Sequence, residues 1–428
     1  MMNPLPPAAN SYYRATERGR PASTPWLSES RVDVAIVGGG FVGLSCALHL
    51  ARAGVRVCVL EQGDIGFGAS GRNGGQVHVG MRRDQWWLES QFGVARAHEL
   101  WDYALEARRH LDELLARYQI ECDFKPGLIH VNHKAKYDVD TQHYVDHLST
   151  QYGYDALQYW SKDQMQTELS AQGYYGGCFD ARGGHLHPLN FTLGIARAAL
   201  SEGARLYTDV CVRSLDTQSA IKRVVTSRGV IEASHVVLAA NGYLGALEPK
   251  VARRVMPINN FIATTVPLGE RASTLIKRDA AVSDSRFVVN YFRRTADGRM
   301  LFGGGENYSY RFPSDIGAFV RPFLEKVFPQ LKGVALDYAW GGTLAITPNR
   351  MPYIRELNPG YMNASGFSGL GVVLAPMVGK SLAQALLGDR DVFERLAQLP
   401  STAFPGGQWF RSPALVAAML FYALRDRL

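Results

Sequence analysis

The stretch that decides the fold is Arg31-Val32-Asp33-Val34-Ala35-Ile36-Val37-Gly38-Gly39-Gly40-Phe41-Val42-Gly43. Its first part, Arg31–Val37, is a short apolar run rich in β-branched residues, which predicts a buried strand. Residues 41–53 change to helical character, and Gly54 is a residue type that often ends a helix. Val55–Leu60 predicts a second buried strand. A strand, a helix and a strand in so short a span indicate a parallel βαβ unit with a right-handed crossover.

Between the first strand and the helix lies a glycine motif, G-x-G-x-x-G, formed by Gly38, Gly40 and Gly43. Gly38 permits a tight turn, Gly40 lets the backbone approach a pyrophosphate, and Gly43 lets the helix pack on the strand. The helix that begins at Phe41 offers free N–H groups and the positive end of its dipole to phosphates. Glu61, at the end of the second strand, can accept hydrogen bonds from an adenosine ribose. These features predict a dinucleotide site; the alternative is a glycine-rich turn in an unrelated α/β protein.

The segment around and after Glu61 narrows the choice of dinucleotide. The charge of Glu61 would repel a 2′-phosphate, which disfavours NADP, whereas NAD and FAD share the same ribose contact. A glycine-rich loop, Gly66–Gln76, then offers backbone amides and polar side chains to an extended ligand; the alternative is a mobile surface loop. We expect the cofactor to contact Gln62, Ala69, Ser70, Arg72, Asn73, Gly74, Gly75 and Gln76.

Composition excludes several other classes of protein. The chain has 428 residues, of which 46% are hydrophobic and 20% charged, as in a folded globular protein of two or three domains. Its net charge of +7 is spread over short pairs such as Arg82-Arg83, which indicate a solvated surface, so we expect no nucleic-acid partner. The five cysteines are widely spaced and form no C-x-x-C pair, which argues against a disulfide framework and favours a reducing, cytoplasmic location.

Two local features do not predict sites of their own. His185 and His187 are two residues apart, but no further ligands stand at a suitable spacing, so we expect no metal. The apolar stretch Ala414–Leu424 is too short to span a bilayer. We expect a C-terminal helix docked on the body of the protein and no membrane association, with a membrane-surface helix as the alternative.

Four segments occur in an order that resembles a known family. They are Val34–Glu61, the loop Gly68–Gln76, Ala239-Ala240-Asn241-Gly242 and Ser365-Gly366-Phe367-Ser368-Gly369-Leu370-Gly371. Together they resemble the FAD-dependent amine and amino-acid oxidases, which include D-amino-acid, glycine and sarcosine oxidases. Within that family the chain is similar to the gamma-glutamylputrescine oxidase branch. The matches there include Ser11-Tyr12-Tyr13, Tyr291-Phe292-Arg293 and Phe404-Pro405-Gly406-Gly407.

The resemblance implies an α/β fold in which a Rossmann-type FAD-binding domain is interleaved with an antiparallel-sheet α+β substrate domain. We expect the FAD-binding domain at residues 31–90, 160–245 and 336–400, the substrate domain at 91–159 and 246–335, an N-terminal arm at 1–30 and a C-terminal helix at 401–428. The resemblance also implies cofactor contacts at Val212, Ala240, Asn241, Gly242, Gly342, Gly366, Gly369, Leu370, Gly371 and Val372. A helix that starts near Gly371 would direct its positive end toward the flavin.

Relatives with covalent flavin attach it through a cysteine or a histidine. Because no cysteine lies in a flavin-facing glycine segment and the loop Arg72–Gln76 has no histidine, we expect non-covalent FAD.

The implied reaction removes a hydride from the carbon beside a primary or secondary amine. The resulting imine is hydrolysed to an aldehyde, and molecular oxygen reoxidises the flavin to give hydrogen peroxide. The implied substrate is a gamma-glutamyl amine or a polyamine-type amine, and the positive net charge favours one with an anionic end. We expect substrate contacts from Tyr291, Arg293, Trp340 and His78, for which a core, surface or structural role is the alternative, and we assign no catalytic residue.

Two other functions stay open at this point. One is an amino-acid dehydrogenase that passes electrons to a quinone or another carrier. The segment Met300–Gly305 lacks the lysine that sarcosine oxidase relatives carry near the flavin, so activation of oxygen is expected to work differently or to be poor. The other is a non-catalytic dinucleotide-binding partner protein.

Overall fold

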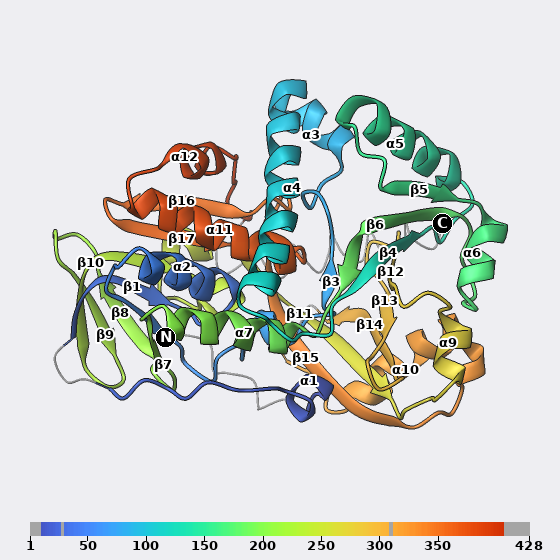
Figure 1. The fold of residues 1–428 in the computed structure, drawn as a ribbon, viewed down its shortest axis with the longest axis horizontal. Helices are drawn as coiled ribbons and strands as arrows, with labels where there is room; N and C mark the ends of the chain where they lie inside the picture. Colours follow the sequence, from blue (N-terminus) through green and yellow to red (C-terminus); the bar gives the residue numbers. More distant parts are fainter. Residues whose placement is uncertain (1–9, 27–29, 308–310, 406–428) are drawn as a thin grey trace.

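The structure is a computed structural model that describes residues 10–26, 30–307 and 311–405. It contains two large β-sheets, the first on the left and the second on the right of the view in Figure 1. The fold class is therefore the predicted one, mixed α/β with two sheets.

Within the described residues the first sheet has eight strands and includes the predicted βαβ unit. The strands are β1 (Ser30–Val37), β2 (Val57–Leu60), β7 (Arg205–Tyr207), β8 (Val212–Asp216), β9 (Lys222–Thr226), β10 (Val230–Leu238), β16 (Tyr353–Asn358) and β17 (Tyr361–Ser365). Their order is β16-β17-β10-β1-β2-β7, and β9 pairs with both β10 and β8. The strands β7, β2, β1, β10 and β17 are parallel to one another, which is the arrangement that crossover helices require.

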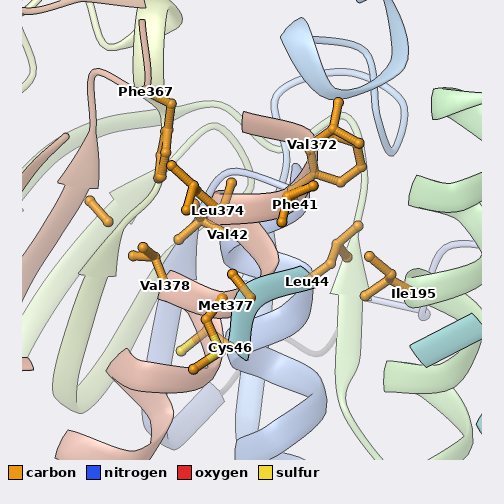
Figure 2. Packing of buried hydrophobic residues seen from close by; sticks show 14 of the residues in the cluster. Phe41, Val42, Leu44, Cys46, Ile195, Phe367, Val372, Leu374, Met377 and Val378 are labelled. Atoms are coloured by element: carbon orange, nitrogen blue, oxygen red, sulfur yellow. The ribbon is translucent and has the colours of Figure 1, made fainter. Parts of the chain in front are cut away.

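Helices α2 (Phe41–Arg52), α7 (Pro188–Ser201) and α11 (Gly371–Leu386) pack on one face of this sheet, and α4 (Val94–Arg117) packs on α11. Figure 2 shows side chains of α2 and α11 packed against each other, among them Phe41, Val42, Met377 and Val378. The two helices approach closely because Gly379 has no side chain: a Cβ there would lie 2.5 Å from the carbonyl oxygen of Val42. Because this contact joins α11 to the first turn of α2, it determines how the two helices lie relative to each other.

In the described residues the second sheet has nine strands, and all its pairings are antiparallel except that of β12 with β4. The strands are β3 (Gln76–Val77), β4 (Lys125–Val131), β5 (Leu157–Trp160), β6 (Gly177–His185), β11 (Met256–Thr265), β12 (Ala281–Asp284), β13 (Tyr291–Arg294), β14 (Met300–Asn307) and β15 (Leu336–Ile346). The other helices are α1 (Tyr12–Ala15), α3 (Gln85–Phe92), α5 (Tyr137–Tyr152), α6 (Lys162–Glu168), α8 (Pro249–Ala252), α9 (Arg271–Leu275), α10 (Ile316–Val327) and α12 (Asp391–Ala397).

A few helices and strands do not lie with the sheet that the predicted domain ranges imply. β3, β6 and β15 fall within ranges expected for the FAD-binding domain but are strands of the second sheet. Conversely, α4 falls within a range expected for the substrate domain and packs on α11 beside the first sheet. The reason is that strand partners come from distant parts of the chain, as when β6 pairs with β4. The domain boundaries themselves stay a prediction.

The chain ends add two observations. Tyr12 and Tyr13 of the N-terminal arm are buried, and α1 contacts α7 of the first sheet's helical layer and β15 of the second sheet. The apolar stretch 414–424, predicted to be a helix, lies outside the described residues. Within the described ranges no single helix is long and apolar enough to cross a membrane, although the bent pair α11 and α12 meets the criteria of length and composition.

Candidate functional site

The glycine turn between β1 and α2 forms one wall of the site. Gly38 has φ +113°, and a Cβ there would lie 2.7 Å from the carbonyl oxygen of Ala239 at the end of β10. A Cβ on Gly43 would overlap the carbonyl oxygen of Gly38. Gly40 is the N-cap residue of α2 and has no side chain that could cap the helix. The backbone N–H groups of the first turn therefore need partners from elsewhere. The turn is therefore tight, and at Gly40 no side chain blocks the approach of a phosphate group.

Glu61 lies at the carboxyl end of β2 beside this turn. Its carboxylate accepts hydrogen bonds from the backbone N–H of Gly39 at 2.7 Å and of Gly63 at 3.0 Å. Burial raises the pKa of Glu61, and these backbone hydrogen bonds oppose the rise. The adjacent Gln62 has a buried side-chain oxygen that no described residue contacts through a hydrogen bond, so this end of the site has an unsatisfied acceptor.

The loop predicted to hold the cofactor is fastened by its own side chains. Ser70 accepts a hydrogen bond from the backbone N–H of Phe41 at 3.0 Å, which joins the loop to the first turn of α2. Asn73 donates to the carbonyl oxygens of Ala69 and Ser70, both at 2.9 Å, and accepts from the N–H of Gly75 at 2.7 Å. These bonds preorganise the loop before any ligand arrives.

A cavity of about 420 Å³ lies where this loop, α2 and α11 meet the second sheet. Fourteen residues predicted to contact the cofactor line it, namely Gly40, Phe41, Ala69, Ser70, Arg72, Asn73, Gly74, Gln76, Asn241, Gly342, Gly369, Leu370, Gly371 and Val372. Nine do not line it, namely Gly38, Gly43, Glu61, Gln62, Gly75, Val212, Ala240, Gly242 and Gly366. Several of the nine shape the turns around the cavity, as Gly366 does with φ +76°. The cavity is therefore one part of the predicted site.

Two of the four predicted substrate residues, Tyr291 and His78, line this cavity. The Tyr291 ring covers Gly74, where a Cβ would lie 2.6 Å from it, and its hydroxyl donates to the side-chain oxygen of Asn260. The neighbouring Phe292 is fully buried on the other side of β13, as strand alternation predicts. His78 follows β3 and hydrogen-bonds to Gln76 at 3.1 Å.

The other two, Arg293 and Trp340, lie behind the cavity wall. Arg293 is 4% exposed and donates to the carbonyl oxygens of Gly74 and Leu186 and to the hydroxyl of Tyr13. Trp340 is 1% exposed, and its indole N–H donates to the carbonyl oxygen of Arg72 at 3.0 Å. In this structure both residues support the loop Gly66–Gln76 through its backbone, and neither lines the cavity.

Several cavity residues were not predicted from the sequence. Arg82 and Arg350 line the cavity, as do His130, Ser283 and Asn260. A solvated surface was expected for most of the arginine pairs, whereas Arg82 lines the cavity. The sequence gives no signal for these residues, because they come from separate elements that only the fold brings together.

The two histidines considered for metal binding are engaged elsewhere. His185 donates to the carbonyl oxygen of Asp279 at 3.0 Å. His187 accepts from the N–H of Asn190 through Nδ1, and its Nε2 hydrogen-bonds to Thr16. Among the residues that the structure describes, no three His, Cys, Asp or Glu side chains form a group that could hold a metal ion.

Comparison with known proteins gives one family match and several similar chains. The profile of the family described as "DAO: FAD dependent oxidoreductase" matches residues 33–385. The chain is 40% identical to the "Probable oxidoreductase OrdL" of Rhizobium meliloti (strain 1021), with 97% of each chain covered. It is 39% identical to the "Gamma-glutamylputrescine oxidoreductase" of Escherichia coli (strain K12), with 98% of each covered. The crystal structure of glycine oxidase from Bacillus cereus ATCC 14579 has the same fold, with a TM-score of 0.70, 20% identity, and coverage of 85% of this chain and 98% of that one.

Proposed function

The chain belongs to the FAD-dependent oxidoreductase family and acts on amines, and we propose that its substrate is a gamma-glutamyl amine, which it oxidises at the carbon next to the terminal amine. The observation that carries this proposal is the charge of the cavity. Arg72, Arg82 and Arg350 line it, and none of the described lining residues is an aspartate or a glutamate. Such a cavity favours a substrate with a carboxylate and disfavours a free polyamine, which carries at least two positive charges.

The residues of the site fit FAD. The uncapped start of α2 and the loop around Ser70 would hold the pyrophosphate, and Glu61 and Gln62 would hold the adenosine ribose. When bound, FAD accepts the hydride that leaves the substrate carbon. We propose that it is held without a covalent bond. No cysteine is among the described residues that line the cavity, and its two histidines, His78 and His130, hydrogen-bond to Gln76 and Ser283. Release of the flavin into the supernatant on acid precipitation would support this, and retention on the protein would contradict it.

The N-terminus of α11, which is the positive end of the helix dipole, lies at the cavity. Gly369, Leu370, Gly371 and Val372 line it, and Leu370 precedes the helix without a side-chain cap. Backbone N–H groups at a helix start stabilise negative charge that develops nearby. This is where negative charge on the cofactor ring would be stabilised during hydride transfer.

Apolar side chains from strands of the second sheet and from loops line the rest of the cavity. They include Ile258, Val289, Leu344, Ile346 and Phe367. An amine must be neutral to lose a hydride from its neighbouring carbon, and removal from water favours the neutral form. The apolar lining therefore supports the chemistry by keeping the reacting amine away from water.

The arginines are placed by contacts between two distant segments. Arg82 donates from Nε to the carbonyl oxygen of Ser368 at 3.0 Å, and Arg83 donates to that of Asn349 at 3.1 Å. Arg350 follows Asn349 directly and has φ +68°. These bonds bring Arg82 and Arg350 to the same cavity, where guanidinium groups could bind the carboxylate of a glutamyl group.

The electron acceptor and the location are further parts of the proposal. We propose molecular oxygen as acceptor, with hydrogen peroxide as product, and the cytoplasm as location. The free state of all five cysteines supports a reducing compartment. Transfer to a quinone or another carrier is the competing possibility, because Met300–Gly305 contains no basic residue.

The test is anaerobic bleaching of the enzyme-bound flavin by a panel of gamma-glutamyl amines, free polyamines and small amino acids. Fast bleaching by gamma-glutamylputrescine, followed by rapid reoxidation in air with formation of peroxide, is the expected result. Reduced flavin that persists in air would establish the dehydrogenase instead. Bleaching by free putrescine at least as fast as by the gamma-glutamyl form would contradict the proposed substrate. A purified protein without visible flavin absorbance would favour a non-catalytic binding protein.

A further inference from the structure

The side chain of Gln76 fixes the hydrogen-bonding state of His78. Nε2 of Gln76 donates to the backbone carbonyl oxygen of Val282 at 2.7 Å. A carbonyl oxygen can only accept, so the other end of the Gln76 amide, Oε1, is the one that faces His78. Oε1 lies 3.1 Å from Nε2 of His78 and is likewise only an acceptor. Nε2 of His78 must therefore carry the ring proton, which leaves a lone pair on Nδ1.

Nδ1 of His78 is open to a molecule in the cavity. His78 lines the cavity, and its Nδ1 has no hydrogen-bond partner among the described residues. Nδ1 of His78 is also not among the fully buried side-chain nitrogen and oxygen atoms that lack a hydrogen-bond partner. It is therefore accessible to a small molecule. The imidazole thus presents one acceptor to the cavity, whose direction is set by Gln76 on the opposite edge of the ring.

The surroundings keep this imidazole neutral. The pKa of His78 is lowered to about 3. Burial is the largest cause, and the positive charge of Arg82 and the neighbouring His130 contribute to the same shift. Burial also lowers the pKa of His130, whose Nδ1 lies 3.3 Å from the hydroxyl of Ser283. Near neutral pH both rings are uncharged, so His78 can accept a hydrogen bond through Nδ1.

We propose that Nδ1 of His78 accepts an N–H hydrogen bond from the neutral amine of the substrate, and that Gln76 is a positioning residue that selects the required tautomer. This inference rests on the function proposed above. An amine nitrogen has one lone pair and up to two N–H groups. When the protein holds an N–H, the lone pair and the adjacent C–H bond are fixed relative to the cofactor. The proton that the ammonium form must lose goes to solvent water and not to His78, whose ring stays neutral throughout.

The first test compares two substitutions that keep a polar atom on opposite edges of the ring. In His78→Asn the side-chain oxygen can occupy the place of Nδ1, whereas in His78→Gln the polar end lies near the place of Nε2. We expect the rate of anaerobic flavin bleaching by gamma-glutamylputrescine to fall less than about threefold in His78→Asn and about tenfold or more in His78→Gln and His78→Leu. Visible flavin absorbance of each variant shows that the cofactor is retained.

The second test removes the donor from the substrate. A gamma-glutamylputrescine analogue with an N,N-dimethylated terminal amine has a lone pair but, as the free amine, no N–H. If the hydrogen bond is the source of the effect, all three variants should bleach with this analogue within about twofold of the wild-type rate. Equal losses in His78→Asn and His78→Gln, or the same loss with the dimethylated analogue, would overturn the role of His78. A wild-type flavin that no amine bleaches would instead overturn the proposed function, and this role with it.

The role of Gln76 has a readout that does not depend on turnover. In ¹⁵N-histidine-labelled protein, we expect the His78 ring to give the signals of the Nε2–H tautomer, assigned by their loss in His78→Asn. Gln76→Met should produce a mixture of tautomers, and Gln76→Glu should keep the Nε2–H form but raise the pKa of His78, which adds an inflection to the pH profile of bleaching. An Nδ1–H tautomer in the wild-type protein, or an unchanged tautomer in Gln76→Met, would overturn the positioning role.

Discussion

The guanidinium Nε of Arg293 donates a hydrogen bond to the carbonyl oxygen of Gly74 at 2.9 Å. The same guanidinium donates to the hydroxyl of Tyr13 and to the carbonyl oxygen of Leu186, each at 3.1 Å. Tyr13 belongs to the N-terminal arm and is fully buried. The arm thus reaches the glycine-rich loop Gly66–Gln76 through one arginine, although the arm and the loop are far apart in sequence.

This relationship predicts that Arg293 affects cofactor binding more than substrate binding. Arg293→Gln should raise the Kd for FAD about tenfold or more, because three buried acceptors lose a charged donor. Arg293→Lys should recover little, since an ammonium cannot reproduce the forked geometry. The measurement is quenching of FAD fluorescence on titration of apoprotein, with Arg294→Gln, a neighbour that pairs with Asp279, as the control. An unchanged Kd for FAD with a raised KM for the amine would assign Arg293 to the substrate instead.

The glycine turn makes a steric prediction. Gly43→Ala places a methyl group on the carbonyl oxygen of Gly38, so the start of α2 must move. We expect loss of FAD affinity of at least tenfold together with destabilisation of about 1–3 kcal/mol, which is typical of overpacking. Gly317→Ala, in the first turn of α10, meets nothing nearer than 3.3 Å and serves as the control. Comparable FAD affinity in the two variants would show that this turn does not set the phosphate geometry.

The parts of the fold that the sequence predicts are local ones. The run Arg31–Val37, the helix after it and the strand Val57–Leu60 are determined by apolar periodicity and glycine placement over short distances. The start of α11 at Gly371 was predicted for the same kind of reason. What joins these elements is the packing of helices whose contact surfaces come from opposite ends of the chain.

The parts that could not be predicted depend on long-range contacts. An arginine in a sequence gives no sign of which carbonyl oxygens surround it, so Arg293 was expected to contact the substrate but lies behind the wall of the cavity. Arg82 was expected on the surface and lines the cavity, because its segment is fastened to Ser368. It could be predicted that only one of Tyr291 and Phe292 faces the cavity, because successive side chains of a strand point to opposite faces. The residue that lines the cavity is Tyr291.

The cavity arginines predict a specific change in substrate preference. Arg82→Gln and Arg350→Gln should each raise the KM for gamma-glutamylputrescine about tenfold while kcat changes little, because each removes a cation that could bind the carboxylate at a distance from the reacting carbon. N-acetylputrescine has the same amine and amide but no carboxylate, so its KM should stay within about twofold in both variants. A similar rise in KM for both amines would mean that the arginines shape the cavity without recognising the carboxylate.

Buried histidines predict how stability depends on pH. Burial lowers the pKa of His49, His78 and His187 to about 3 and that of His110 to about 4, whereas an unfolded chain has the ordinary value near 6.5. Below pH 6.5 the unfolded state therefore binds protons that the folded state does not, so stability is complete above that pH and falls toward pH 4.

Each histidine contributes a slope of about 1.4 kcal/mol per pH unit over this window, and the four together about 5 kcal/mol per unit at most. Urea unfolding of the FAD-saturated enzyme between pH 7.5 and 5 measures it. His110→Gln should reduce the slope by about one histidine's share, because glutamine keeps a polar side chain next to His49 but takes up no proton. The exposed substitution Gln142→Ala, which changes no titratable group, should leave the slope unchanged. A wild-type stability that is flat from pH 7.5 to 5 would mean that these rings are already solvated or paired in a way that lets them charge in the folded state.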